Sequence, residues 1–277
     1  MISRMNAQKA KKNAADHALR AQNAAWPGVM TAPPSPEGAT HPRIDLGGTW
    51  ERYVEAKLLD YVMVPSSLHP SGFYRLKRSI AVPRLSEGQR AWAHFDAITY
   101  HGRVFVNGVE LGTTIPYVPH EFEFTRQAKE GVNQIEVAIA DLVPDPSGAG
   151  KDEIALGLNP GWEGYGGIIR DAYIELRPSA FIDNAQLSYQ LNSNYTRVSC
   201  RLRVFLSSSM ASSGQLELAL FERNSEVARA SKAVEIPKGS TEVDLTFEVD
   251  APTLWSPTEP NLYDLKVNLK SASGEDS

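Results

Sequence analysis

Residues 161–171, Gly-Trp-Glu-Gly-Tyr-Gly-Gly-Ile-Ile-Arg-Asp, have residue types suited to contact a small polar ring. Their four glycines surround Trp162 and Tyr165 and give the backbone freedom where side chains would collide. Trp and Tyr present flat apolar faces with a polar edge, which suits stacking against a sugar ring. Asn159 and Glu163 are close in sequence and could hydrogen-bond sugar hydroxyl groups. We therefore predict a carbohydrate-contact site made of Asn159, Trp162, Glu163 and Tyr165.

Trp162 and Tyr165 also have a second interpretation, in which their rings pack against other parts of the protein. The glycines would then permit two layers of polypeptide to approach closely. The sequence alone leaves both interpretations open.

No other set of residues has the types and spacing of a catalytic or metal site. The motifs G-x-S-x-G, H-E-x-x-H and G-x-x-x-x-G-K-[ST] do not occur, and Cys200 is the single cysteine. His69, His94, His101 and His120 are scattered along the chain. We therefore predict no catalytic residue, no metal ligand and no cofactor within this sequence.

Glu121 and Glu123 are the acidic residues whose spacing comes closest to a catalytic pair. Alternate residues of a strand lie on one face, about 6 to 7 Å apart. We expect both carboxylates to face solvent while Phe122 and Phe124 face the core.

The composition is that of a soluble globular protein with room for two domains. The 277 residues are 42% hydrophobic and 22% charged. The net charge of −5 argues against nucleic-acid partners and against a basic membrane-binding patch. No run of about 18 apolar residues occurs, so we predict no membrane-spanning segment.

Residues 1–43 differ from the remainder of the chain. Residues 7–25 are rich in Ala, Asn, Gln and Lys, and residues 32–38 are rich in Pro. With almost no large apolar side chain, this part is predicted to be a disordered or weakly helical extension. It lacks the apolar stretch of a secretory signal peptide. Localisation stays open between cytoplasm and periplasm, since a single thiol is compatible with both.

From Ile44 onward the hydrophobic pattern has period two, which predicts strands rather than helices. Asn107-Gly108 between two alternating runs indicates a type I′ hairpin turn, and Trp50 and Trp92 within such runs are expected in the core. We predict an all-β protein with a jelly-roll β-sandwich at residues 44–179, followed by an immunoglobulin-like β-sandwich at residues 180–277.

Several stretches, in order, resemble glycoside hydrolase family 2, the group of β-galactosidases, β-glucuronidases and β-mannosidases. They are L-G-G-T-W at 46–50, V-P-S-S at 64–67 with G-F-Y-R at 72–75, F-D-A-I-T-Y through V-F-V-N-G at 95–108, the glycine-rich loop with I-R-D at 169–171, L-W-S-P at 254–257 and P-N-L-Y at 260–263. The resemblance covers about residues 44–270 and strengthens the jelly-roll, galactose-binding-like assignment of the first sandwich.

The resemblance implies a retaining β-glycosidase in which the two sandwiches are followed by a (β/α)₈ barrel carrying both catalytic carboxylates. No barrel is recognised within this sequence, so the resemblance assigns no catalytic residue here and implies no activity for this chain alone. Loops of the first sandwich in this family often close one side of the barrel's pocket. Both interpretations of Trp162 and Tyr165 agree with that role.

Three functions follow as hypotheses. The favoured one is the non-catalytic N-terminal portion of a family 2 β-glycosidase acting on O-glycosidic bonds in carbohydrate metabolism, with a scaffold or weak sugar-binding role. Its partners would be a β-glycoside ligand and the barrel. The alternatives are a stand-alone, lectin-like carbohydrate-binding module and a module for assembly of a homo-oligomer.

Overall fold

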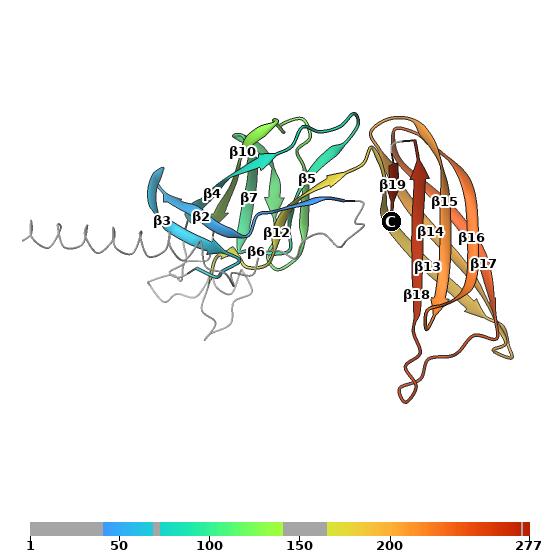
Figure 1. The fold of residues 1–277 in the computed structure, drawn as a ribbon. Coiled ribbons are helices and arrows are strands. Elements are labelled where there is room, and N and C mark those ends of the chain that lie inside the picture. The colour runs from blue at the N-terminus through green and yellow to red at the C-terminus, as the bar shows by residue number, and fades with distance from the viewer. Residues whose placement is uncertain (1–40, 69–72, 141–164, 273) are drawn as a thin grey trace, which may run out of the picture. The chain divides into compact units, whose positions relative to one another are not determined.

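The computed structural model describes residues 41–68, 73–140, 165–272 and 274–277, and builds them from β-strands (Figure 1). No helix occurs in these ranges, so none of their residues belongs to a helix that could cross a membrane. The paired strands are antiparallel. The predicted all-β class is therefore confirmed.

The chain divides into two compact units. Among the described residues, the first unit takes those between 43 and 84 and between 91 and 175. The second takes residues 41–42 and 85–90 and those from 176 onward. We keep 44–179 and 180–277 as proposed domain bounds.

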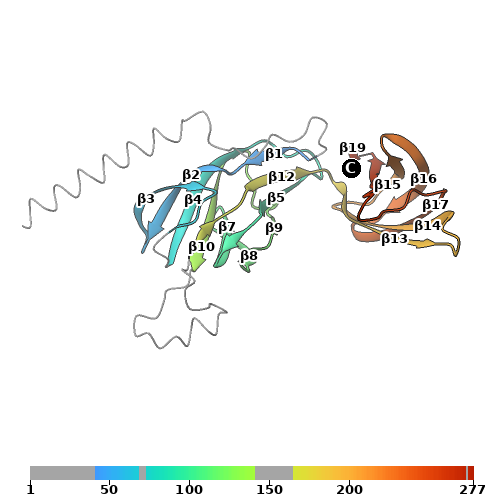
Figure 2. The same cartoon turned by 90° about the horizontal axis from the view of Figure 1, so that it is seen from below.

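The first unit is a β-sandwich of two larger sheets, which Figure 2 shows as separate layers. One sheet has the strand order β3-β2-β4-β10-β7-β8 and the other has the order β1-β12-β5-β9, while β11 pairs with β6. The strands are β1 (Arg43–Asp45), β2 (Gly48–Val54), β3 (Lys57–Val64), β4 (Phe73–Val82), β5 (Arg90–Phe95), β6 (Ile98–Thr99), β7 (His101–Val106), β8 (Val109–Thr114), β9 (His120–Glu123), β10 (Gly131–Ala140), β11 (Gly167–Ile168) and β12 (Ala172–Arg177).

The core of the first unit follows from the alternation of its strands. Trp50 is fully buried as predicted, and its indole N–H donates to the carbonyl oxygen of Leu46 at 2.7 Å. The prediction for Trp92 is wrong. Ala91 and Ala93 fill the inward positions of β5, so Trp92 lies on the opposite face and is only partly buried.

The hairpin between β7 and β8 has the predicted turn. Val106 and Val109 pair directly, so only Asn107 and Gly108 form the connection. Their φ angles are +52° and +81°, as a type I′ turn requires at both positions.

The second unit is also a β-sandwich, with one sheet ordered β13-β14-β17 and the other β16-β15-β18-β19 (Figure 2). Its core is built from alternate residues of these strands, including the buried Cys200. Burial raises the pKa of this thiol, as expected for a structural cysteine. The strands are β13 (Ala180–Leu191), β14 (Arg197–Ser208), β15 (Ser212–Glu222), β16 (Ser225–Ile236), β17 (Gly239–Asp250), β18 (Tyr263–Ser271) and β19 (Gly274–Asp276).

Candidate functional site

Only one of the four predicted contact residues belongs to the described part of the chain. Asn159, Trp162 and Glu163 lie outside the described residues. Tyr165 is described and comes two residues before β11. The contact role of all four stays a prediction, and the site is built here from Tyr165 outward.

Two pairings hold the backbone around Tyr165. On one side, Leu68 and Gly166 exchange backbone hydrogen bonds, with N···O distances of 2.7 Å from the Leu68 N–H and 3.3 Å from the Gly166 N–H. On the other side, Gly167 pairs with Thr99 in the β11–β6 ladder. The Thr99 hydroxyl also donates to the carbonyl oxygen of Tyr165 at 3.4 Å. Three segments distant in sequence therefore fix where the Tyr165 ring lies.

Gly167 is required by the close approach of the segment that contains Ser66. Its φ of +139° lies in a region that residues with a Cβ rarely adopt. A Cβ at this position would lie 2.4 Å from the backbone oxygen of Ser66. Ser66 is held in turn, because its N–H donates to the carbonyl oxygen of Ile168 at 2.9 Å. Gly167 is therefore needed for the close packing of its own segment against the segment that contains Ser66.

Tyr165 belongs to a row of aromatic side chains. Tyr117 lies edge-to-face with it, with ring centroids 6.3 Å apart, and Tyr100 lies edge-to-face with Tyr117 at 5.9 Å. His101 continues the row, 5.5 Å from Tyr100 between ring centroids. Tyr100, Tyr117 and Tyr165 are each partly exposed, so a ligand can reach part of each ring. We call these three residues the tyrosine cluster.

The hydroxyl groups of the tyrosine cluster also interact. A hydrogen bond with Tyr117 raises the pKa of Tyr165, and burial and the neighbouring phenols Tyr117 and Tyr100 act in the same direction. The Tyr165 phenol therefore stays neutral around pH 7. A neutral hydroxyl can both donate and accept a hydrogen bond, as a sugar hydroxyl does.

We did not predict Tyr100 or Tyr117 as site residues. Tyr117 lies in a turn after β8, with a left-handed φ of +67°, and no local spacing connects it with Tyr165. Tyr100 is adjacent to His101 in the sequence. This pair of aromatic residues was the one local pattern that could have indicated a site at Tyr100.

A hollow of about 250 Å³ adjoins the segment that pairs with Gly166. It is lined by hydroxyl-bearing and apolar side chains, namely Thr49, Tyr61, Val62, Met63, Ser66, Ser67 and Leu68. The volume is near the lower end of small-molecule pockets, about 300 Å³. Leu68 lines the hollow and also pairs with Gly166, the residue after Tyr165. The hollow therefore lies beside the backbone segment that holds the Tyr165 end of the tyrosine cluster.

The acidic residues of β9 contact different partners instead of each other: Glu121 pairs with His94, and Glu123 accepts a hydrogen bond from the Thr125 hydroxyl at 2.8 Å. Glu121 and Glu123 are exposed and Phe124 is fully buried, as predicted, whereas Phe122 is only partly buried. The Glu121 carboxylate lies 3.0 Å from Nδ1 of His94, and the Asp96 carboxylate lies 2.7 Å from Nε2 of the same ring. The imidazole therefore separates two carboxylates.

His94 is further held by a stack of side chains. Its ring lies parallel to that of Tyr173, with centroids 4.4 Å apart, and the Arg43 guanidinium lies 4.2 Å from the Tyr173 centroid. Burial alone lowers the pKa of His94, but hydrogen bonds and charges from Glu121 and Asp96 outweigh it and raise the pKa. Burial also raises the pKa of Tyr173 to about 12. Arg43 also pairs with the Glu175 carboxylate at 3.0 Å, so each cation of this group lies against a carboxylate, which is typical of a structural network.

Metal ligation has no support in the described ranges, which contain no group of three or more His, Cys, Asp and Glu residues able to hold an ion.

Sequence comparison relates the chain to enzymes of carbohydrate chemistry. The model of the family "Glycosyl hydrolases family 2" matches residues 180–277. A β-galactosidase of Priestia megaterium is 25% identical over 228 residues, which cover 80% of this chain and 21% of the relative. A β-galactosidase of Vibrio cholerae is 26% identical over 215 residues, covering 74% and 20%. The chain thus spans about a fifth of the length of these curated relatives.

Solved structures share the fold of the chain. A putative β-galactosidase from Bacteroides fragilis has a TM-score of 0.72 at 18% identity, covering 86% of this chain and 40% of that one. The β-glucuronidase 2 of Bacteroides uniformis has a TM-score of 0.71 at 15% identity, covering 85% and 31%. A β-D-mannosidase from Dictyoglomus thermophilum has a TM-score of 0.68 at 17% identity, covering 84% and 34%.

The family model thus matches the second unit, and most of the chain aligns with β-galactosidases at about a quarter identity. The chain is therefore similar to glycosyl hydrolases of family 2, and its residues 180–277 match the model of that family.

Proposed function

We propose that the chain forms a non-catalytic part of a retaining β-glycosidase that acts on O-glycosidic bonds, and that its first unit contacts the sugar. The observation that carries this proposal is the tyrosine cluster. Its rings are partly exposed, and the pairing of β11 with β6 holds Tyr165, which follows Trp162 and Glu163 closely in the sequence. The sugar class is a β-linked hexopyranoside, in keeping with the relatives named as β-galactosidases.

In this role the chain orients a sugar and leaves its cleavage to another domain. Tyrosine faces pack against the C–H face of a pyranose, and the Tyr165 hydroxyl can donate to or accept from a sugar hydroxyl. Retaining cleavage needs two carboxyl groups about 5 to 5.5 Å apart, one of them with a raised pKa. The carboxylates of Glu121 and Asp96 are instead turned to opposite nitrogens of His94. The (β/α)₈ barrel implied by the family would supply the catalytic pair.

The test is calorimetric titration of the purified chain with methyl β-galactoside, methyl β-glucuronide and methyl β-mannoside. We expect weak binding of one of them, and a loss of about two- to tenfold in affinity in Tyr165→Ala and in Tyr117→Ala, from the usual strength of aromatic contacts. Tyr195→Ala is the matched control, because Tyr195 is 61% exposed in the second unit. Equal affinity of all variants for every sugar would refute the proposed contact.

The non-catalytic assignment has a separate test. The purified chain should not hydrolyse aryl β-glycosides. Turnover that a single substitution such as Glu121→Gln abolishes would overturn it. Tight binding to one sugar without any further domain would instead favour the lectin-like alternative, and a stable homo-oligomer without sugar binding would favour the assembly module.

A further inference from the structure

The β13-β14-β17 sheet of the second unit has β13 at one edge and β17 at the other. β13 pairs with β14 from Ala180 to Leu191. Among the described residues, no strand pairs with β13 on its other side. An edge strand presents backbone N–H and C=O groups with which a further strand can pair. The edge of β13 is therefore open to the addition of a strand.

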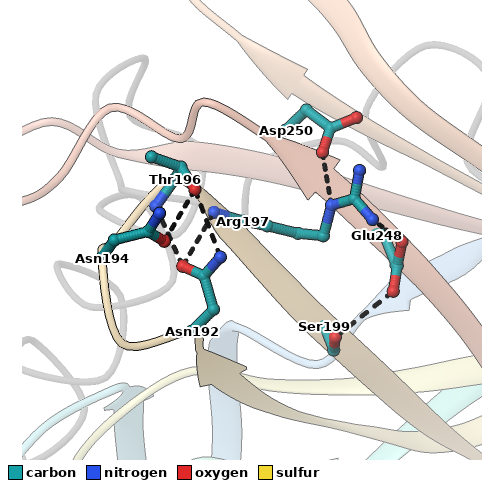
Figure 3. Close-up of polar contacts among 7 residues, drawn as sticks. All are labelled: Asn192, Asn194, Thr196, Arg197, Ser199, Glu248 and Asp250. Carbon is teal, nitrogen blue, oxygen red and sulfur yellow. Dashed lines mark hydrogen bonds and ion pairs between the residues drawn. The ribbon is translucent and has the colours of Figure 1, made fainter.

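The open edge of β13 lacks the charged side chains that usually protect an edge strand. Charged residues and prolines at an edge normally prevent its pairing with another chain. Figure 3 shows Arg197 of β14 next to two acidic residues of β17, with Asp250 at 2.6 Å and Glu248 at 3.3 Å. The charges of this sheet thus gather on β14 and β17. Residues 184–192, in contrast, contain no charged residue and no proline.

The uninterrupted part of β13 is bounded by an asparagine at each end. At one end, the strand has a bulge at Asn184, whose side chain accepts the N–H of Ala185 at 2.8 Å. At the other end, the side-chain oxygen of Asn192 accepts two main-chain N–H groups of the following turn, at 2.9 and 3.1 Å (Figure 3). Regular strand extends between them from residue 185 to residue 191, with Ser188 at its centre.

This stretch is symmetric about Ser188 in the character of its side chains. It reads Ala-Gln-Leu-Ser-Tyr-Gln-Leu. Gln186 and Gln190 lie two positions before and after Ser188. Leu187 and Tyr189 lie one position before and after it. Two antiparallel copies of the stretch that meet at Ser188 therefore place Gln opposite Gln and Leu opposite Tyr, with no charge at the contact.

The two large apolar side chains at the centre of the stretch are incompletely covered within one chain. Leu187 pairs in register with Leu202, and Tyr189 pairs with Cys200. Leu202 and Cys200 are buried in the core, and directly paired residues share a face of the sheet. Leu187 is nevertheless 43% exposed and Tyr189 is 69% exposed. Antiparallel pairing of two copies would bring Leu187 of each against Tyr189 of the other.

We propose that β13 pairs antiparallel with β13 of a second copy of this chain, about a twofold axis at Ser188. The two three-stranded sheets then form one continuous sheet across the dimer. A twofold contact uses the same surface on both copies, so that surface must complement itself, and the symmetric stretch does so. Main-chain hydrogen bonds supply the affinity and the alternate side chains fix the register. Because one strand pair is a small interface, we expect a reversible dimer with a dissociation constant of about 10 µM to 1 mM.

Sedimentation equilibrium of the full chain over this concentration range tests the dimer. Ser188→Lys places two ammonium groups opposite each other at the axis, so we expect it to weaken the dimer at least about fivefold. Ser199→Lys is the matched control. Ser199 is an exposed serine of β14, the central strand, and does not lie at the sheet edge. This control should leave the dissociation constant unchanged.

Paired substitutions test the register. Residue 186 of one copy lies opposite residue 190 of the other. Gln186→Lys combined with Gln190→Glu therefore creates two attractive pairs and should tighten the dimer about two- to tenfold. Gln186→Lys combined with Gln190→Lys creates two repulsive pairs and should weaken it by a similar factor of about two to ten. Equal dissociation constants for the two double variants would contradict the register.

A cross-link gives an independent readout. Directly opposite residues of an antiparallel pair have Cα atoms about 4.5–5.5 Å apart, within the range of a disulfide. Ser188→Cys should therefore form a covalent dimer on mild oxidation, whereas Ser199→Cys should not. If Ser188→Lys fails to fold, this cross-link decides.

Two results would overturn the proposal. One is a chain that stays monomeric up to about 1 mM. The other is a dimer that Ser188→Lys leaves intact, because another surface would then hold it. The proposal does not rest on the sugar contact of the first unit, since the variants at Ser188 should leave sugar binding unchanged and Tyr165→Ala should leave the dimer unchanged.

Discussion

Replacement of Gly167 by alanine tests the packing that positions the tyrosine cluster. The new Cβ would lie 2.4 Å from the backbone oxygen of Ser66, whereas real Cβ contacts stay beyond 3.0 Å. A backbone oxygen cannot rotate away as a side chain can. The β11 segment or the Ser66 segment must therefore move, and the hydrogen bond between the Ser66 N–H and the Ile168 carbonyl is the first contact at risk.

The magnitude follows from two contributions. A non-glycine residue in a sparsely populated φ region costs about 1–3 kcal/mol, and a broken internal hydrogen bond costs about 0.5–1.5 kcal/mol. We therefore expect Gly167→Ala to lower the free energy of unfolding by about 2–4 kcal/mol. A shift of β11 also displaces Tyr165, so sugar binding should weaken in any Gly167→Ala protein that remains folded.

The assay is urea unfolding followed by circular dichroism, with Gly131→Ala as the control. Gly131 has a φ of +87°, yet a Cβ at this position would meet no atom within 4 Å. This control therefore isolates the backbone cost, about 1–2 kcal/mol. Equal destabilisation by the two variants would refute the role of the contact with Ser66.

Three further predictions concern stability and reactivity. The pKa of His94 is raised above its ordinary value of 6.5. Its ion pairs therefore stabilise the fold fully below about pH 6.5, and this stabilisation is lost as the pH rises through the raised pKa. His94→Gln should remove this pH dependence from the midpoints of urea unfolding. Asn133 is fully buried, and its amide bonds to the main chain at Lys129 and Gly131 and to Asn107; Asn133→Ala should cost roughly 2–3 kcal/mol in the same assay, and a cost below about 0.5 kcal/mol would contradict this. Because burial raises its pKa, Cys200 should react with a disulfide reagent only on unfolding, and fast reaction in the native state would contradict its burial.

The sequence was informative where short-range patterns decide the outcome. Period-two alternation predicted the strands of both units, because a strand with one buried face must alternate. The turn at Asn107 and Gly108 was predictable, since both positions need positive φ. The exposure of Glu121 followed from the burial of Phe124 by the same rule. The burial of Trp92 was predicted wrongly because alternation alone does not show which face of a strand points into the core.

The tertiary structure decided everything that depends on contacts between distant segments. Tyr165 meets Tyr117 because a turn after β8 lies near β11, and no local spacing contains that information. The need for glycine at position 167 arises from the carbonyl of Ser66. By itself, the sequence determined an all-β chain with an aromatic, glycine-rich segment. Which rings gather beside that segment was decided only by sheet pairing, since backbone hydrogen bonds do not depend on side-chain identity.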